Sequence, residues 1–126
     1  MNALQGLRIL VVENDEMSAT LLEMQLAQSG AIVVGTAATV ADALRLVDTA
    51  SPQIVLLDYR LAHHETSDPV AERLAAQGLP FVVATGMAPH ELPDAFRAGV
   101  VLVKPYLTKE LEAALVLALQ DHPVAS

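Results

Sequence analysis

One carboxylate, Asp58, stands directly behind a run of four apolar residues at positions 54–57. Such a run, introduced by Ser51-Pro52, predicts a short strand that is buried on both faces. Packing gives no reason to place a carboxylate at the end of this strand. An open parallel sheet, however, presents its ligand crevice just beyond the carboxyl ends of its strands. Asp58 is therefore a candidate for chemistry at that crevice, and the alternative is that it caps a loop or the next helix.

Polar residues follow three further apolar runs in the same way. The carboxyl ends of parallel strands share one edge of a sheet, so acids, a hydroxyl and an ammonium group would converge there. Each residue alone has an ordinary explanation, as a helix-dipole acid, a turn hydroxyl or a solvated lysine. Their joint occurrence favours a functional site. The runs and the residues behind them are 7–12 with Glu13 and Asn14, 79–84 with Thr85, and 100–103 with Lys104.

Helical patterns separate these runs from one another and from a further predicted strand at 31–37. Asp68 followed by Pro69 predicts a helix start, whereas Pro89 and Pro93 allow only a short or distorted helix around 93–98. Strands that alternate with helices predict an α/β fold, a doubly wound five-stranded parallel sheet with helices on both faces. The other helices are predicted at about 16–28, 40–49, 69–77 and 108–120.

The first predicted helix carries an apolar stripe. Leu21, Leu22 and Leu26 recur at helical spacing, with Met17 and Ala19 beside them. Stripes of this kind are more often core than docking surface, so we expect these side chains to be buried, and docking at the exposed early residues of the helix is the alternative.

Composition limits the class of protein. The chain has 126 residues, 53% hydrophobic and 17% charged, which predicts one folded domain over 1–126 with a core at about 7–120. The net charge of −8 argues against nucleic-acid binding. The absence of cysteine excludes disulfides, thiol catalysis and zinc–thiolate sites. Without a secretory signal or an 18-residue apolar run, we expect a cytoplasmic protein with no membrane partner. His63 and His64 are adjacent in a polar loop, which favours solvation over transition-metal binding.

The combination of motifs resembles the receiver domain of two-component response regulators, over residues 7 to about 120. The similar motifs are V-V-E-N at 11–14, V-L-L-D-Y-R-L at 55–61, A-T-G at 84–86 and V-K-P-Y at 103–106. The resemblance implies a flavodoxin-like sheet of order 2-1-3-4-5. It also implies that Asp58 accepts a phosphoryl group from a histidine kinase or a histidine phosphotransfer protein. Such a protein is an autocatalytic phosphoacceptor rather than a turnover enzyme.

The resemblance further implies a Mg²⁺ site and a phosphate site. Lys104 would pair with phosphate oxygens, and the Thr85 hydroxyl would donate to one of them. A carboxylate needs no deprotonation at neutral pH, so positioning and charge neutralisation by Mg²⁺ would supply most of the catalysis. The implied metal ligands are Glu13, Asn14, Asp58 and the backbone carbonyl of Arg60.

Asn14 is a departure from the family pattern, because the family usually has a metal-binding Asp there. An amide oxygen can ligate Mg²⁺ but brings no charge, so we expect weaker metal binding and poor use of small phosphodonors. Asp15 is an alternative ligand if the register shifts slightly.

The region between Thr85 and Lys104 departs as well. Val101 stands where the family has an aromatic switch residue, three positions before the lysine. The stretch 80–87 resembles the P-F-x-F-A-T-G motif of a subfamily of receivers, often single-domain, from alphaproteobacteria, which lack a regular fourth helix and act in stress and phosphorelay signalling. Val83 replaces the second Phe of that motif, and Ala88 replaces the usual Tyr. We therefore expect output through reordering of residues 86–98 rather than through an aromatic flip.

Three functions remain open from the sequence. The first is a stand-alone receiver that signals by phosphorylation-dependent protein–protein contact or passes phosphate within a phosphorelay. It has no room for a DNA-binding effector, unless the chain is a domain of a longer protein. The second is a degenerate receiver that binds a partner without phosphorylation, motivated by Asn14. The third is a flavodoxin-like enzyme that binds a small molecule, which the lack of a Gly-rich loop after the first strand disfavours.

Overall fold

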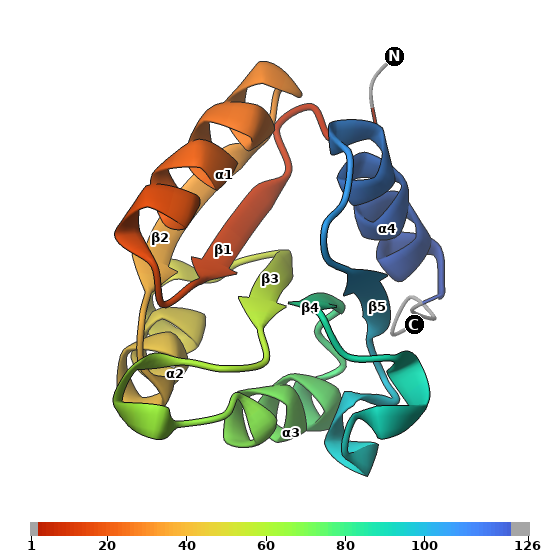
Figure 1. Cartoon of the computed structure of the whole chain (residues 1–126). Helices are drawn as coiled ribbons and strands as arrows, with labels where there is room; N and C mark the ends of the chain where they lie inside the picture. The colour runs from red at the N-terminus through yellow and green to blue at the C-terminus, as the bar shows by residue number, and fades with distance from the viewer. Residues whose placement is uncertain (1–2, 122–126) are drawn as a thin grey trace.

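The computed structural model describes residues 3–121, in which strands and helices alternate (Figure 1). The strands are β1 (Arg8–Val12), β2 (Ile32–Ala37), β3 (Ile54–Asp58), β4 (Phe81–Thr85) and β5 (Val100–Val103). The α-helices are α1 (Glu16–Gln28), α2 (Val40–Ala50), α3 (Asp68–Gln77) and α4 (Thr108–Asp121). Three short 3-10 turns are η1 (Ala62–His64), η2 (Pro89–Glu91) and η3 (Asp94–Phe96).

The five strands form one parallel sheet in the order β2-β1-β3-β4-β5, which confirms the predicted topology. β3 and β4 lie inside the sheet, and their apolar residues are buried, as predicted for residues 54–57 of β3. Because side chains alternate between the faces of a strand, these two strands supply both cores. All five strands run in the same direction, so their carboxyl ends meet at one edge.

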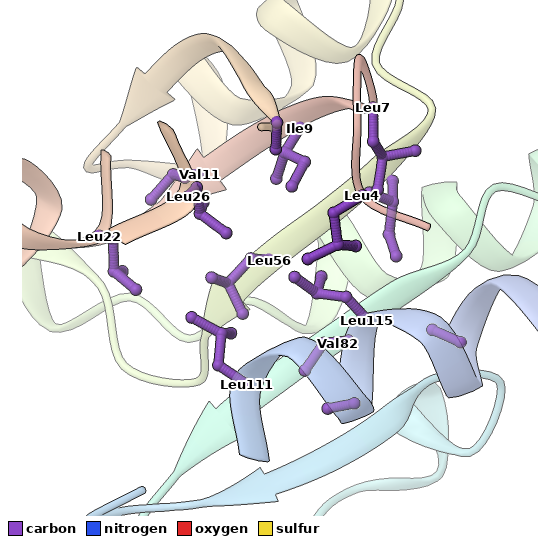
Figure 2. Packing of buried hydrophobic residues seen from close by; sticks show 14 of the residues in the cluster. Leu4, Leu7, Ile9, Val11, Leu22, Leu26, Leu56, Val82, Leu111 and Leu115 are labelled. Atoms are coloured by element: carbon purple, nitrogen blue, oxygen red, sulfur yellow. The ribbon is translucent and has the colours of Figure 1, made fainter. Parts of the chain in front are cut away.

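Helices cover the sheet on both sides. On one side, α1 and α4 pack onto the sheet through Leu22, Leu26, Leu111 and Leu115, as Figure 2 shows. On the other side, the core contains residues of α2 and α3 together with the buried ring of Phe96. Within residues 3–121, none of the helices is long and apolar enough to cross a membrane.

The start of α3 corrects one detail of the sequence prediction. Ser67, not Asp68, occupies the N-cap position, and Asp68 and Pro69 lie in the first turn of the helix. The Ser67 hydroxyl makes no capping hydrogen bond. Pro69 is accommodated because backbone N–H groups of the first turn have no partner within the helix. Asp68 adds a negative charge near the positive end of the helix dipole.

The exposed side of α1 corrects a second prediction. Met17, Leu21 and Met24 are 75%, 58% and 56% exposed, so they are not core residues. Positions 17, 21 and 24 share one face of a helix, and Leu22 and Leu26 share another. Only the second face meets the sheet, because α1 covers the sheet from one side. The apolar stripe of α1 is thus wider than the surface that buries it.

The chain between β4 and β5 forms η2 and η3 rather than a regular helix, which confirms the prediction of a short or irregular fourth helix. Pro89 opens η2, and Pro93 directly precedes η3. Each proline lacks a backbone N–H, so a continuous helix through both is unfavourable. In Figure 1 this teal segment lies beside α3, and η3 contacts that helix.

Candidate functional site

Four of the five polar residues predicted at strand ends meet at the carboxyl edge of the sheet. Asp58 ends β3, Thr85 ends β4, Lys104 follows β5, and Glu13 follows β1. The backbone N–H of Lys104 donates to the carbonyl oxygen of Thr85 at 2.8 Å, which fixes the start of the loop after β5. The structure therefore brings the predicted acids, hydroxyl and ammonium group to one place.

Asp58 and Lys104 form an ion pair at the centre of this edge. The Lys104 Nζ lies 2.7 Å from Asp58 Oδ1. The Asp58 side chain is 12% exposed, whereas that of Lys104 is 40% exposed. Lys104 reaches the mostly buried carboxylate from the solvent side on a flexible side chain. Its ammonium group can therefore also pair with a negatively charged group that is transferred to Asp58.

The charge on Asp58 is unfavourable in this environment. Burial, followed by a side-chain hydrogen bond with Glu13 and the charge of Glu13, raises the pKa of Asp58, whereas the hydrogen bond with Lys104 and the charge of Lys104 lower it; together they place the pKa at about 7. For Lys104, burial lowers the pKa, but the interaction with Asp58 and the charge of Glu13 outweigh that effect and raise it. Without a further cation, Asp58 is thus only partly ionised near neutral pH.

Thr85 is buried, and its hydroxyl faces the chain that follows β4. The Thr85 Oγ1 accepts a hydrogen bond from the Met87 backbone N–H at 3.1 Å. The hydroxyl proton takes no part in that bond, so the same group can donate to another acceptor. A cavity of about 220 Å³ beside Asp58 is lined by Thr85, Met87 and Lys104. A group attached to Asp58 has room there and has hydrogen-bond donors on two sides.

The acidic residues after β1 have different positions. Glu13 is buried, and its Oε2 accepts from the Asp15 backbone N–H at 3.0 Å. Asn14 is exposed and lines a neighbouring cavity with Arg60. Asp15 is the N-cap of α1, and hydrogen bonds from the Ser18 backbone and side chain lower its pKa. Since the Asp15 carboxylate serves as a helix cap, it is a poor replacement for Asn14 as a metal ligand.

A family model described as "Response regulator receiver domain" matches residues 9–119. The chain belongs to this family. The solution structure of SdrG from Sphingomonas melonis Fr1 is similar, with 39% sequence identity, a TM-score of 0.77, and coverage of 94% of this chain and 99% of SdrG. A BeF3-activated conformation of SdrG, from Pseudomonas melonis Fr1, has a TM-score of 0.75 at the same identity and coverage.

Two similar proteins are longer than this receiver domain. The response regulator PhyR from Brucella abortus is 28% identical, with a TM-score of 0.78, and the match covers 91% of this chain and 48% of that chain. The transcriptional regulatory protein PdtaR from Mycobacterium tuberculosis is 28% identical over 114 residues, which cover 88% of this chain and 56% of PdtaR. The chain therefore spans about half the length of each of these two proteins.

Receiver domains generally bind Mg²⁺, and the residues at this site fit that ion. Within residues 3–121, no cluster of three His, Asp or Glu side chains is placed to hold a metal. Mg²⁺ does not need one, because it binds through one or two carboxylates and keeps several waters. Glu13 and Asp58 supply two carboxylates whose interaction raises the pKa of Asp58. Two neighbouring carboxylates with one nearby lysine carry an excess of negative charge. A divalent cation bound between them would neutralise that charge.

The other predicted metal ligands lie beside this pair. Arg60 lies opposite Thr66 in a single antiparallel β-bridge. The backbone hydrogen bonds of this bridge are made by the residues on either side of Arg60, so the Arg60 carbonyl oxygen takes no part in them. Arg60 lines both the cavity with Asp58 and the cavity with Asn14. The ligand role of Asn14 and of the Arg60 carbonyl stays a prediction.

The two histidines after β3 belong to no group of side chains that could hold a metal ion, within the described part of the chain. His63 and His64 are exposed, and both have a left-handed backbone, with φ of 61° and 60°. The next residue, Glu65, accepts a hydrogen bond from the Val40 backbone N–H at 2.9 Å and so ties the loop to the start of α2. These histidines are solvated residues of a tight turn, as the sequence indicated.

Sequence reasoning missed one residue of the site, Tyr59. Its ring packs against Phe96 in an edge-to-face arrangement, with centroids 5.4 Å apart and an interplanar angle of 72°. Tyr59 also lines the cavity beside Asp58. The signal in the sequence was the position of an aromatic residue directly after the candidate carboxylate, in a chain with only two Tyr and two Phe.

Proposed function

We propose that Asp58 accepts a phosphoryl group from a histidine kinase or a histidine phosphotransfer protein, and that the phosphorylated domain signals by contact with a protein partner. The observation that carries this proposal is the 2.7 Å pair of Asp58 and Lys104 at the edge of a cavity that Thr85 also lines. Membership in the receiver family supports it, since receivers are typically phosphoacceptors without turnover.

The transfer reaction follows from these positions. A carboxylate oxygen of Asp58 bonds to phosphorus while the bond from phosphorus to the donor's imidazole nitrogen breaks, and the imidazole keeps the electron pair. Lys104 stabilises the negative charge of the transferred group, and the Thr85 hydroxyl donates to one of its oxygens. Bound Mg²⁺ would neutralise the charge of Glu13 and Asp58 and so favour the ionised, nucleophilic form of Asp58.

The phosphodonor must bring its histidine to this edge, and the surface beside the edge suits a protein donor. The exposed apolar face of α1 (Met17, Leu21 and Met24) leads to a cavity of about 710 Å³ that Glu13 and Lys104 help to line. We propose that the donor docks on this face. Apolar side chains with this exposure are common at protein interfaces and have no role in the core of this domain.

The domain is proposed to act within the group of receivers that includes SdrG and PhyR. The identity to SdrG, the stretch 80–87 and the lack of a regular helix between β4 and β5 support this placement. One similar structure is that of the "PhyR stress response regulator". We therefore propose a role in stress signalling, with a single receiver domain over 1–126 acting on a protein partner rather than on nucleic acid.

The mass of the intact chain tests phosphoryl transfer directly. The protein is incubated with a histidine kinase, ATP and Mg²⁺, and a mass increase of one phosphoryl group is expected. Asp58→Ala should abolish the increase, whereas Asp48→Ala, which removes an exposed carboxylate in α2, should retain it. Lack of transfer from several kinases, together with no Mg²⁺-dependent NMR shift at Asp58, would instead support a binding module that works without phosphorylation.

A further inference from the structure

The chain lacks the aromatic switch residue that receivers carry in the last strand, because Val101 occupies that position. An aromatic contact nevertheless joins the phosphoacceptor strand to the irregular segment at 86–98. Tyr59, directly after Asp58, packs edge-to-face against Phe96 of η3. The guanidinium carbon of Arg60 lies 5.6 Å from the Tyr59 ring centroid and adds a cation–π contact.

Phe96 is the anchor of the segment. It is 2% exposed, and every other side chain at 86–98 is at least partly exposed. The turns η2 and η3 are short, with the 3-10 hydrogen bonds from Leu92 N to Pro89 O and from Arg97 N to Asp94 O. Such turns have little stability of their own. The position of the segment therefore depends on where the Phe96 ring is held.

The opposite end of the segment is tied to the site as well. Met87 donates its backbone N–H to the hydroxyl of Thr85, and both residues line the cavity beside Asp58. Tyr59 lines the same cavity. A group that is attached to Asp58 thus meets both connections to the segment, one through a hydrogen bond and one through an aromatic ring.

The surroundings of Phe96 leave room for a second position. A surface cavity of about 350 Å³ is lined by Phe96, Leu92 and Val101. A small residue at 101 leaves this space, which a larger aromatic side chain at that position would fill. A ring beside an unfilled cavity can be repacked at lower cost than a ring enclosed on all sides.

We propose that Tyr59 and Phe96 form the contact through which the state of Asp58 is transmitted to residues 86–98, in place of the missing aromatic switch. The proposal rests on the proposed function, since it requires a phosphoryl group on Asp58. A phosphoryl group on Asp58 occupies the cavity that Tyr59 lines, and the Tyr59 ring shifts against Phe96. The Phe96 ring then moves toward the space beside Val101. Tyr59 and Phe96 are positioning residues here, because they act through the segment and not on the reacting atoms.

Amide NMR spectra with and without beryllofluoride and Mg²⁺ test the proposal. Wild-type protein should show shifts both at the site, at Asp58 and Thr85, and across 86–98. In Tyr59→Leu the site should still shift, while the response of the segment should be lost or reduced. An aromatic pair of this kind corresponds to a roughly twofold to tenfold change in the balance between two arrangements of the segment. Tyr59→Phe keeps the ring and should restore the response.

Tyr106→Leu is the matched control, because Tyr106 packs on the opposite face of the sheet from Phe96. It should leave the response at 86–98 intact. A full response of the segment in Tyr59→Leu overturns the proposal, and so does a wild-type segment that does not respond while the site does. If beryllofluoride causes no shift at Asp58 in the wild type, the proposed function itself fails. The two failures are therefore distinguishable.

Discussion

Replacing Asp58 by Asn should stabilise the metal-free protein, and increasingly so as the pH rises. Burial and the neighbouring Glu13 raise the pKa of Asp58 from 3.8 to about 7 in the folded protein. In the unfolded chain the carboxyl group has its ordinary value. Between these two values the unfolded chain has released a proton that the folded protein still holds. The folded state therefore loses stability as the pH rises through this window, up to the folded pKa.

The size of the effect follows from the same two values. Each pH unit inside the window costs the wild type about 1.4 kcal/mol of unfolding free energy. From about pH 5 to about pH 8, most of which lies inside the window, the loss is about 2–3 kcal/mol. Asp58→Asn has no such proton to release. Its stability relative to the wild type should therefore increase by about 2–3 kcal/mol over that interval.

Urea unfolding in the presence of EDTA measures this difference at the two pH values. Asp48→Asn, at an exposed acid in α2, serves as the control and should follow the wild type. Adding Mg²⁺ at the higher pH should restore stability to the wild type and have little effect on Asp58→Asn, since a bound cation favours the ionised carboxylate. The reasoning is wrong if the wild type and Asp58→Asn change in parallel with pH.

Three further predictions concern the surroundings of the site. Asn14→Asp should bind Mg²⁺ roughly threefold to tenfold more tightly in a metal titration, because a carboxylate adds charge that the amide lacks, and equal affinities would count against Asn14 as a ligand. Leu21→Ser should slow phosphotransfer from a kinase without changing beryllofluoride binding. The control Leu117→Ser, at an exposed position of α4, should change neither the phosphotransfer rate nor beryllofluoride binding. Equal phosphotransfer rates for the two variants would contradict docking on α1. Gly99→Ala should lower the melting temperature by an amount equivalent to about 1–3 kcal/mol, because the added Cβ would overlap the buried ring of Phe81; an unchanged melting temperature would show that the ring can move aside.

The order of elements and the meeting of the strand ends were predictable from the sequence for a physical reason. Strands buried on both faces form uninterrupted apolar runs, and a polar residue directly after such a run marks the edge of the sheet. Asp58, Thr85 and Lys104 were found in this way, and their positions in the structure agree with the prediction. The irregular chain between β4 and β5 was predictable because two prolines break any helix there.

Other features depended on contacts that a sequence does not display. The exposure of Met17, Leu21 and Met24 could not be predicted, because α1 has apolar residues on more than one face and only packing decides which of them is covered. The pairing of Tyr59 with Phe96 joins residues from distant parts of the chain. The raised pKa of Asp58 depends on burial and on the distance to Glu13, neither of which the motif encodes.

The balance of charge at the site gives a reason why Asn14 would be compatible with the proposed phosphorylation. Before transfer, the contacting groups Glu13, Asp58 and Lys104 together carry one net negative charge, which Mg²⁺ more than neutralises. After transfer, the charge of Asp58 is replaced by a phosphoryl group of about −2, so the same groups carry about two negative charges and Mg²⁺ brings them close to neutral. A further carboxylate at position 14 would leave the phosphorylated site with an excess negative charge. On the proposed function, Asn14 would therefore weaken metal binding mainly before transfer, and the phosphorylated state would hold the cation with a matched charge.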